Sequence, residues 1–367
     1  MSAPGTACAE CLRRSWLLGE LGPVLDRLTG DRSRLLDTLA LDRAQLLAAL
    51  GGRRRGELQA RMDALAEHEL GPPAPFAAVC RHAPGCPAAM LDPAAPTMLF
   101  HDGSRGLVEE LLAGPVVALV AATRTSDYGA EVARALARGL SVAGVTVAAA
   151  ARGAVPDAVH RGAAEVGCAS IAAAAGGLGT ATTAHRQPPG TGRKRRACTV
   201  SELPCASAGR RWGAVAAERV LVGLCAVLVV VECSDAPAEL ASAELARAGG
   251  RVVAAVPGRV TSPLSAGPHA LLRDGARLAR STGDVLELLD RPAAPGSWTP
   301  GGPAAGLEPR LRGVLERVAG GCETAEELCH GAPDPTSVLL ALSELELLGV
   351  LLRGEGGRYL PSAAPPA

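Results

Sequence analysis

Between Val116 and Ala279, short apolar runs alternate with amphipathic helical segments. The apolar runs are VVALVAA (116–122), VTVAAAA (145–151), SIAAAA (170–175), CTVSE (198–202), AVLVVVE (226–232) and RVVAAV (251–256). Apolar strands separated by helices are typical of a parallel sheet that helices cover on both faces. The alternation therefore predicts an α/β fold with a doubly wound, mostly parallel sheet. In such sheets, ligands bind beyond the carboxyl ends of the strands.

The rest of the chain divides into segments of different composition. Residues 11–70 place leucines three and four positions apart, which predicts an N-terminal helical domain over 1–72. The α/β core is expected over 73–290, and residues 291–306 have the Pro- and Gly-rich composition of a linker. Residues 307–362 show three helical patterns followed by a two-stranded pattern, which is the order of a winged helix.

The third helical pattern of this C-terminal module spans 334–349. It contains Asp334, Glu344 and Glu346 but neither Lys nor Arg. A helix that reads DNA needs cations or amides for phosphates and base edges. We therefore expect the module to have a structural or protein-binding role.

Charge and cysteine content limit the classes of partner. The chain has 37 basic and 37 acidic residues, so no whole-molecule field attracts it to nucleic acid or to a membrane. The longest apolar run, 220–231, is too short to span a bilayer and is predicted to be a buried helix end followed by a strand. Eleven cysteines without regular spacing suit a reducing compartment. We expect a cytoplasmic protein without membrane contact.

The loop after the first core strand contains Thr123 and Arg124. A hydroxyl and a guanidinium at a strand end suit a phosphate, because the guanidinium supplies paired donors. Ala122 precedes them, and its Cβ hinders the close backbone approach that a glycine would allow. The chemistry of this loop leaves two interpretations open: a phosphate site, or a capped turn with a solvated arginine.

The loop after the last core strand contains the glycines and hydroxyls expected of an anion site. Its candidate binding residues are Gly258, Arg259, Ser262, Ser265 and Gly267. Backbone N–H groups and hydroxyls after a buried strand suit an anion cradle. We therefore predict that this loop binds phosphate.

Basic residues also cluster beside an aromatic. Arg195 and Arg196 belong to the run RKRR, and Arg211 is followed directly by Trp212. Stacking of a base on an aromatic side chain contributes about 1–3 kcal/mol. Such clusters are expected in proteins that bind single strands, although a solvated basic loop is the alternative.

Four segments form a recognisable series. In chain order they are CRHAPGCPAAMLDPAAPTMLFHDG (80–103), ALVAATRTSDYG (118–129), ERVLVGLCAVLVVVE (218–232) and GGRVVAAVPGRVTSPLSAGPHALLRDGARL (249–278). Together these segments resemble the DNA-processing protein A family, also called DprA or Smf. The resemblance covers most of the chain, and its specificity comes from the order and spacing of the segments. It implies a Rossmann-like core, an N-terminal helical domain like a SAM or helix-hairpin-helix domain, and a terminal winged helix.

The resemblance also implies a function. Members of the family bind single-stranded DNA, form dimers and help to load the RecA recombinase during natural transformation, without catalysis. Thr123 and Arg124 match the Thr-Arg of the family's loop, and Arg152 lies near a matching position. Arg219 is what remains of an Arg-Asn-Arg sequence, in which Glu218 now replaces a polar contact and weakens the attraction for phosphate.

Two other functions remain open. One is a nucleotide-binding or nucleotide N-glycosidase-like protein with a related core, for which Glu232 at a strand end is the plausible acid. The characteristic Pro-Gly-Gly-x-Gly-Thr loop and catalytic Glu of that class are not recognisable in the chain. The other is a degenerate family member that serves as a protein-interaction scaffold.

A metal site is the remaining possibility. Cys8 and Cys11 form a Cys-x-x-Cys pair, and Cys80, His82 and Cys86 follow much later. A zinc site with four ligands would require the two groups to meet in space. Because a lone pair at this spacing is a weak signal, we predict no metal and no cofactor.

Overall fold

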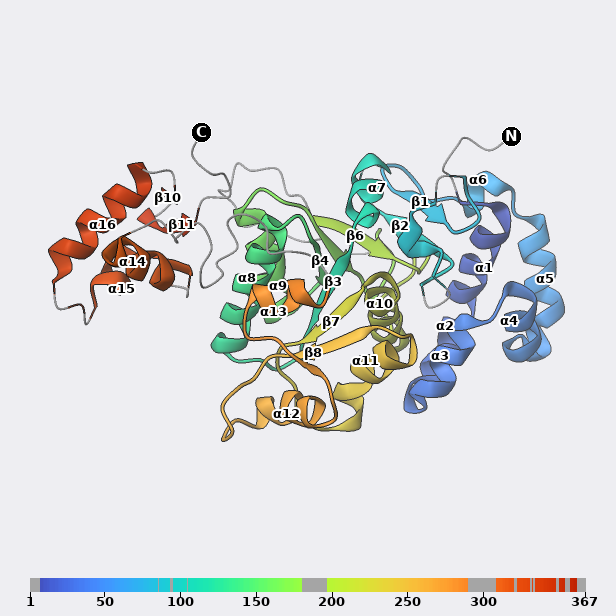
Figure 1. Cartoon of the computed structure of the whole chain (residues 1–367). Coiled ribbons are helices and arrows are strands. Elements are labelled where there is room, and N and C mark those ends of the chain that lie inside the picture. The colour runs from blue at the N-terminus through green and yellow to red at the C-terminus, as the bar shows by residue number, and fades with distance from the viewer. Residues whose placement is uncertain are drawn as a thin grey trace. The chain divides into compact units, whose positions relative to one another are not determined.

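The computed structural model describes residues 7–84, 86–92, 95–103, 105–179, 197–289, 308–319, 322–330, 332, 334–347, 350–353 and 357–361 (Figure 1). Contacts divide the chain into two compact units. The first comprises Met1–Arg138 and Val145–Arg280, and the second comprises Gly139–Gly144 and Ser281–Ala367.

A nine-stranded sheet of order β1-β2-β6-β5-β4-β3-β7-β8-β9 forms the centre of the first unit. Its parallel strands are β3 (Val116–Val120), β4 (Thr146–Ala150), β5 (Ser170–Ala173), β6 (Ala197–Ser201), β7 (Val227–Val230), β8 (Val252–Ala255) and β9 (Arg277–Leu278). All six strands predicted from the apolar runs are therefore present. The prediction of a mostly parallel sheet in an α/β fold is confirmed.

Two further strands extend the sheet at one edge. Strands β1 (Ala77–Cys80) and β2 (Met98–His101) pair antiparallel, with Cys80 opposite Met98. Strand β2 also pairs antiparallel with β6. Neither strand is apparent in the sequence, because both are short and they flank a proline-rich segment with no alternating helix.

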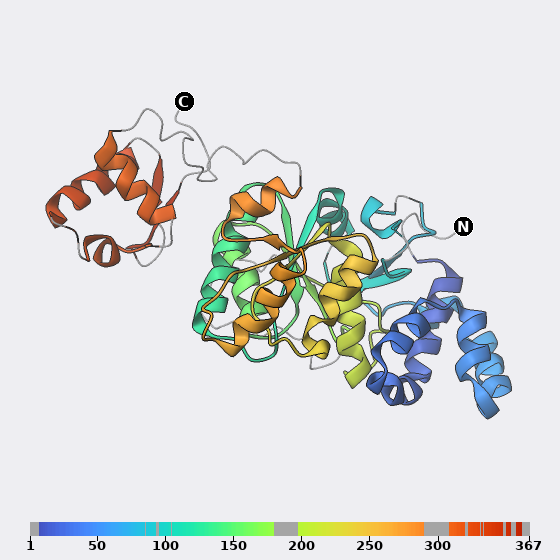
Figure 2. The same ribbon diagram turned by 60° about the horizontal axis from the view of Figure 1, so that its bottom comes forward.

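Helices cover both faces of the sheet, as Figures 1 and 2 show. On one side, α7 (Arg105–Ala113), α10 (Arg211–Leu224) and α11 (Pro237–Ala248) contribute to one core cluster with the strands. On the other side lie α8 (Asp127–Val142) and α9 (Ala154–Glu165). Helix α12 (Ala266–Arg273) contacts β8 near the sheet edge. The sheet is thus doubly wound.

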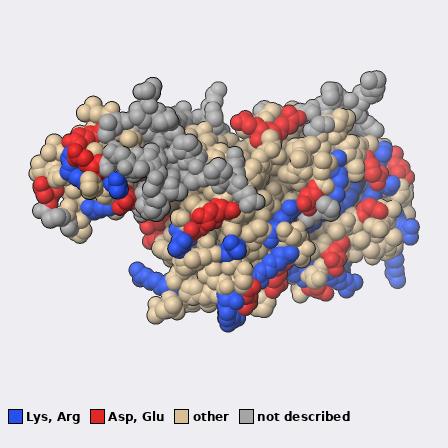
Figure 3. Space-filling model, in the orientation of Figure 1, with Lys and Arg blue, Asp and Glu red and all other residues tan. Residues whose placement is uncertain are grey.

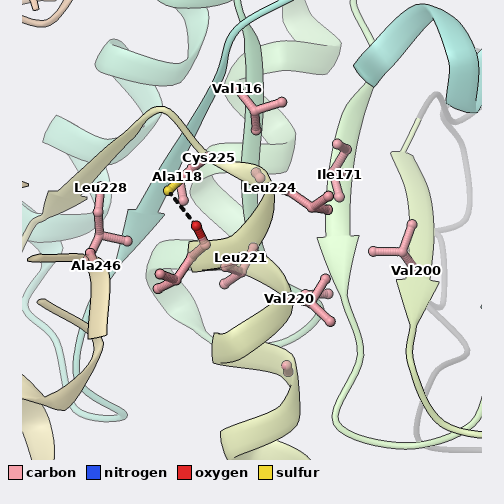
Figure 4. Close-up of a cluster of buried hydrophobic side chains, with 14 of the residues drawn as sticks. Val116, Ala118, Ile171, Val200, Val220, Leu221, Leu224, Cys225, Leu228 and Ala246 are labelled. Carbon is pink, nitrogen blue, oxygen red and sulfur yellow. Dashed lines mark hydrogen bonds between the residues drawn. The ribbon is translucent and has the colours of Figure 1, made fainter. Parts of the chain in front are cut away.

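The core explains why the strands are almost continuously apolar. Val116 and Ala118 of β3 face α10, where they meet Val220, Leu221 and Leu224 (Figure 4). The alternate residues of β3, which point to the other face, are also fully buried. Alternate residues of a strand point to opposite faces, so burial on both sides requires apolar residues throughout.

The N-terminal segment is helical, as predicted. It contains α1 (Ala9–Glu20), α2 (Gly22–Leu25), α3 (Arg32–Ala40), α4 (Arg43–Leu50), α5 (Arg55–Ala64) and α6 (Glu67–Leu70). Asp31 caps α3 by accepting a hydrogen bond from the Arg34 N–H at 3.0 Å, and Asp42 forms a capping box with Gln45 at the start of α4.

The helical segment and α10 share one hydrophobic cluster. Leucines of the helices, including Leu18 and Leu35, pack against Trp212 and Val215 of α10. Contacts between α10 and α3 add to this junction. The helices are therefore packed on the sheet through α10, and the first unit includes both. A domain boundary at residue 72 stays a prediction.

The described part of the second unit contains helices and a short hairpin. After α13 (Thr282–Glu287) come α14 (Pro309–Ala319), α15 (Ala325–Cys329) and α16 (Pro335–Leu347), followed by β10 (Leu351–Arg353) and β11 (Tyr359–Pro361). Strands β10 and β11 pair antiparallel. Three helices followed by two strands is the predicted order, and the winged-helix assignment itself stays a prediction. The predicted linker, 291–306, lies outside the described residues.

No described helix combines the length and the apolar character needed to cross a membrane.

Candidate nucleic-acid interface

A crevice lies at the carboxyl ends of β3 and β7, where the order of the parallel strands reverses. Strand β4 follows β3 on one side, while β7 pairs with β3 on the other. The crevice has a volume of about 160 Å³, and Thr123, Glu218 and Glu239 are among the residues that line it. This is the position at which doubly wound sheets bind ligands.

The N-terminus of α8 is occupied by a carboxylate of the protein itself. Glu232, 4% exposed, accepts hydrogen bonds from the Ser126 N–H at 2.7 Å and from the Ser126 hydroxyl at 2.6 Å. A Cβ on Gly129 would lie 2.4 Å from Glu232 Oε2, so only glycine permits this approach. Glu232 therefore satisfies the donors that could otherwise bind a phosphate.

The N-terminus of α10 is capped in a similar way. The Asp26 carboxylate accepts a hydrogen bond from the Trp212 N–H at 3.4 Å and forms an ion pair with Arg210 at 3.2 Å. Asp26 belongs to a short 3-10 helix, Asp26–Gly30, in the N-terminal segment. The N-termini of α8 and α10 are thus satisfied by carboxylates rather than open to an anion.

The loop after β8 is shaped by close packing. A Cβ on Gly258 would lie 2.1 Å from Ser265 Oγ, and one on Gly267 would lie 2.3 Å from Cys233 Sγ. Ser265 is only 3% exposed, so its hydroxyl faces the loop rather than a ligand, contrary to the prediction of a binding hydroxyl. The carbonyl of Gly258 also accepts a hydrogen bond from His269 Nε2 at 3.1 Å. The two glycines therefore allow the loop to pack closely.

Arg259 and Ser262 remain near the surface of this loop. Arg259 is exposed and Ser262 is half-buried. The Ser262 N–H donates to the Arg259 carbonyl at 2.9 Å, which closes a turn that displays the Arg259 side chain. Their role in binding stays a prediction.

Three exposed arginines follow the carboxyl ends of neighbouring strands. Arg152 follows β4, Arg124 follows β3 and Arg259 follows β8, and we call them the edge arginines. Gly153, at φ 130°, turns the chain after Arg152 into α9. Within the described ranges, none of the three guanidinium groups has an acidic or hydrogen-bonding partner.

Figure 3 shows basic and acidic side chains interspersed over the visible face of the molecule. This distribution agrees with the zero net charge of the sequence. A polyanion would therefore be attracted by local unpaired cations such as the edge arginines, and not by a broad positive field.

The predicted base-stacking role of Trp212 is wrong. Its side chain is 1% exposed and packs in the cluster shared by α10 and the N-terminal helices. A base could not reach the indole without separating these elements. Arg211, the first residue of α10, is exposed, so it remains available for a phosphate. Arg195 and Arg196 lie outside the described residues.

The predicted phosphate contact of Arg219 is also wrong. Arg219 is 8% exposed, donates to Glu202 Oε2 at 2.6 Å and donates to the Leu39 carbonyl at 3.2 Å. Arg14, from α1, donates to the same carbonyl of Leu39, and burial lowers the pKa of Arg14. This buried network links the N-terminal helices to the end of β6. No local sequence pattern indicates this network, because Arg219 and Leu39 lie 180 residues apart in the chain.

Glu218, which the sequence analysis expected to repel phosphate, is neutralised within the fold. Its carboxylate forms an ion pair with Arg32 of α3 and accepts a hydrogen bond from the Ser242 hydroxyl of α11. Glu239, on the same crevice wall, accepts a hydrogen bond from the Ser234 N–H at 2.6 Å. Arg32 balances the charge of Glu218, so Glu239 is the carboxylate that disfavours phosphate groups at this crevice wall.

A second cluster of chemically reactive groups lies away from the crevice. The ligand atoms of Cys8, Cys11, Cys80 and His82 all lie within 4.8 Å of one another. A hydrogen bond with the Cys11 thiol lowers the pKa of Cys80 to about 5, and the same contact raises the pKa of Cys11. Both pairs are visible in the sequence, but their proximity in space is seen only in the structure. Cys86, which the sequence analysis grouped with them, is not among the four.

Comparison with known proteins agrees with this architecture. The sheet and its crevice define a Rossmann-like α/β protein, and a solved structure of DNA processing protein A from Streptococcus pneumoniae is similar, with a TM-score of 0.57 and 22% identity. That match covers 77% of this chain and 98% of the other. The family model described as DNA recombination-mediator protein A matches residues 79–290, and the chain belongs to this family.

Curated relatives include two bacterial proteins. The chain is 33% identical over 247 residues to the putative DNA processing protein DprA of Mycobacterium tuberculosis H37Rv. This match covers 64% of this chain and 62% of the relative. It is 28% identical over 254 residues to protein Smf of Escherichia coli K12, which covers 66% of each. The chain thus matches less than two thirds of each relative's length.

Proposed function

We propose that the chain binds single-stranded DNA along the carboxyl edge of its parallel sheet, as a non-catalytic DNA-processing protein. The observation that supports this most directly is the set of edge arginines, which are exposed and have no acidic partner among the described residues. Membership of the DNA recombination-mediator protein A family supports the same proposal. Arg211 and Thr123, both exposed at the same edge, are further candidate contacts.

The edge arginines are spaced along a line that a strand of DNA can follow. Strands β4, β3, β7 and β8 are consecutive neighbours in the sheet. Adjacent strands lie about 4.8 Å apart, so the three spacings from β4 to β8 place the backbones of Arg152 and Arg259 roughly 14 Å apart. Guanidinium groups at such intervals can contact successive phosphates of one flexible strand. Because these contacts involve only the phosphate backbone of the DNA, we expect little preference for a particular DNA sequence.

Binding of a free nucleotide in the crevice is less well supported. The donors at the start of α8 already bind Glu232, and Glu218 and Glu239 line the crevice. Both oxygens of Glu232 are engaged by Ser126, so this acid stabilises a helix terminus and is a poor candidate for a catalytic acid. These contacts favour DNA binding at the rim over nucleotide N-glycosidase chemistry within the crevice.

Salt-dependent binding of a labelled oligothymidylate tests the proposal. The full chain and a variant in which all three edge arginines are replaced by Ala are titrated at several salt concentrations. Each phosphate contact on a single strand contributes about −0.7 to the slope of log K against log salt. Loss of three contacts should reduce the magnitude of the slope by about 2, together with the affinity.

A matched control removes exposed arginines elsewhere. Arg53, Arg55 and Arg161 are exposed and follow no carboxyl end of the sheet. Their triple replacement by Ala changes the net charge equally and should leave the slope almost unchanged. Failure of the full chain to bind at low salt would refute DNA binding. Equal slopes for the edge variant and the wild type would refute the assigned surface.

The family resemblance leads to further parts of the proposal. We propose that the chain acts in the cytoplasm as a homodimer and transfers the bound strand to the RecA recombinase. Sedimentation at micromolar concentration tests the dimer. Strand-exchange assays with RecA on DNA coated by a single-strand-binding protein test the transfer. A strictly monomeric chain, or no stimulation of RecA, would contradict the corresponding part.

A further inference from the structure

We propose that Cys8, Cys11, Cys80 and His82 bind one Zn²⁺ ion in a closed, structural site. Their ligand atoms lie within 4.8 Å of one another, although the two pairs are about seventy residues apart in the chain. All three cysteines are free thiols, and none is in a disulfide. The site is separate from the proposed DNA-binding edge and does not depend on it.

The distances among these atoms fit a tetrahedral ion. For zinc–sulfur bonds of about 2.3 Å and zinc–nitrogen bonds of about 2.0–2.1 Å, a tetrahedron places sulfur and nitrogen about 3.6 Å apart. His82 Nδ1 lies 3.2 Å from Cys11 Sγ and 3.8 Å from Cys8 Sγ. Both distances lie within about 0.4 Å of this value, and every other pair of ligand atoms lies within 4.8 Å.

Local structure explains how each pair is presented. Cys8 is the extended N-cap residue of α1, and Cys11 lies in the first turn of that helix. Residues three positions apart lie on the same side of a helix, so both thiols face one direction. Cys80 ends β1, and a turn closed by the Ala83 N–H on the Cys80 carbonyl at 3.1 Å places His82 beside it.

The surroundings suit thiolate ligands. Cys80 Sγ accepts a hydrogen bond from the Cys8 N–H at 3.3 Å. Cys11 and Cys80 are buried in an apolar cluster that includes Leu12 and Phe100. Backbone N–H groups that donate to sulfur and an apolar shell are features that stabilise and tune metal sites. Without a metal, three thiols and an imidazole have little reason to meet in this apolar junction.

The donor set identifies both the ion and its role. Three thiolates and one imidazole in a tetrahedron select Zn²⁺ over Mg²⁺ or Ca²⁺, which prefer oxygen ligands. Four protein ligands leave no position for water or substrate, so the ion is structural. It would join the start of α1 to the end of β1, and thus fasten the N-terminal helices to the edge of the sheet.

Metal analysis of the full chain tests the proposal. The protein is purified in reducing buffer from zinc-supplemented cells, and zinc is measured by mass spectrometry. We expect about one zinc per chain in the wild type and at least a tenfold loss in the double variant Cys8→Ser, His82→Ala. Cys8 is half-buried and His82 is exposed, so this variant spares the two buried ligands. Cys86→Ser, in the same region but outside the cluster, should retain the zinc.

X-ray absorption on the wild type provides a test that does not depend on the folding of a variant. We expect three sulfur ligands at about 2.3 Å and one nitrogen ligand at about 2.0 Å. The proposal is overturned if the wild type contains no zinc after loading with zinc chloride, or if the absorption spectrum shows mainly oxygen ligands. It is also overturned if the double variant retains all of its zinc, or if Cys8 and Cys11 are found as a disulfide in the protein purified in reducing buffer.

Discussion

Replacement of Arg219 by Met is expected to destabilise the first unit strongly while leaving DNA binding intact. The guanidinium of Arg219 is buried, and it neutralises Glu202, whose side chain is 2% exposed. It also donates to the Leu39 carbonyl in the N-terminal helices. Methionine retains most of the apolar stem, so the change mainly removes the charge and its hydrogen bonds.

The magnitude follows from what remains after the substitution. Removal of one partner of a buried ion pair typically costs about 3–5 kcal/mol, because the other charge is left without compensation. Glu202 Oε1 already has no hydrogen-bond partner among the described residues, so the remaining carboxylate has little to replace the lost contact. With about 2–3 °C per kcal/mol for a unit of this size, Tm should fall by roughly 6–15 °C.

Thermal unfolding followed by tryptophan fluorescence is a suitable assay, because Trp212 is buried in the cluster that joins α10 to the helices. Arg61→Met is the matched control. Arg61 forms an exposed ion pair with Glu20, and such surface pairs contribute about 0–1 kcal/mol. Glu202→Gln in the Arg219→Met background should recover part of the lost stability, since it removes the carboxylate that lacks Arg219, while Arg14 remains as the buried cation of the network.

Two results would refute this reasoning. A Tm loss no larger than that of Arg61→Met would mean that the Arg219–Glu202 pair is not a buried structural link. If the Arg219→Met variant is as stable as the wild type but no longer binds single-stranded DNA, Arg219 is a DNA contact and not a structural residue. At a temperature well below its Tm, the variant should instead bind DNA with the salt slope of the wild type.

Two smaller effects are expected. Burial lowers the pKa of His101, which is 2% exposed, below the value in the unfolded chain. The stability that neutral His101 contributes is therefore present above about pH 6.5 and is lost as the pH falls through the lowered pKa. The loss in the free energy of unfolding is about 1.4 kcal/mol for each unit by which the fold lowers this pKa. Urea unfolding at pH 7.5 and 5.5 should show a steeper fall for the wild type than for His101→Gln, and equal falls would contradict this. Gly129→Ala should cost about 1–3 kcal/mol, because its Cβ would displace Glu232 from Ser126. In the same urea assay, Gly106→Ala, which meets no atom within 4 Å, should be neutral or slightly stabilising, and a similar loss in both variants would count against the steric argument.

The α/β core was predictable because its signals are local. An apolar run such as 220–231 contains both the end of α10 and the whole of β7, and the short break at Cys225 and Ala226 separates them. Strands of four residues beside prolines, such as β1, give no comparable periodicity. The sequence therefore predicted six of the parallel strands, β3 to β8, but neither the two-residue β9 nor the antiparallel pair β1 and β2 at the opposite sheet edge.

The candidate site was less predictable because its residues depend on distant partners. Arg219 and Trp212 are near the positions expected for DNA contacts, yet the N-terminal helices cover both of them. The acceptor for Arg219 on Leu39 lies 180 residues away, so no local pattern could reveal it. Arg124, Arg152 and Arg259 have no such covering element, and their exposure agrees with their expected place after strand ends.

The position of Glu232 has a consequence for anion binding at this edge of the sheet. A doubly wound sheet normally offers the first turn of the helix after its central strand to an external anion. In this chain, the anion is supplied from the adjacent strand and is covalently part of the protein. A free anion would therefore have to displace Glu232 from Ser126 before it could bind at this helix terminus. The exposed residues of the rim, such as Thr123 and Arg124, are free of this competition.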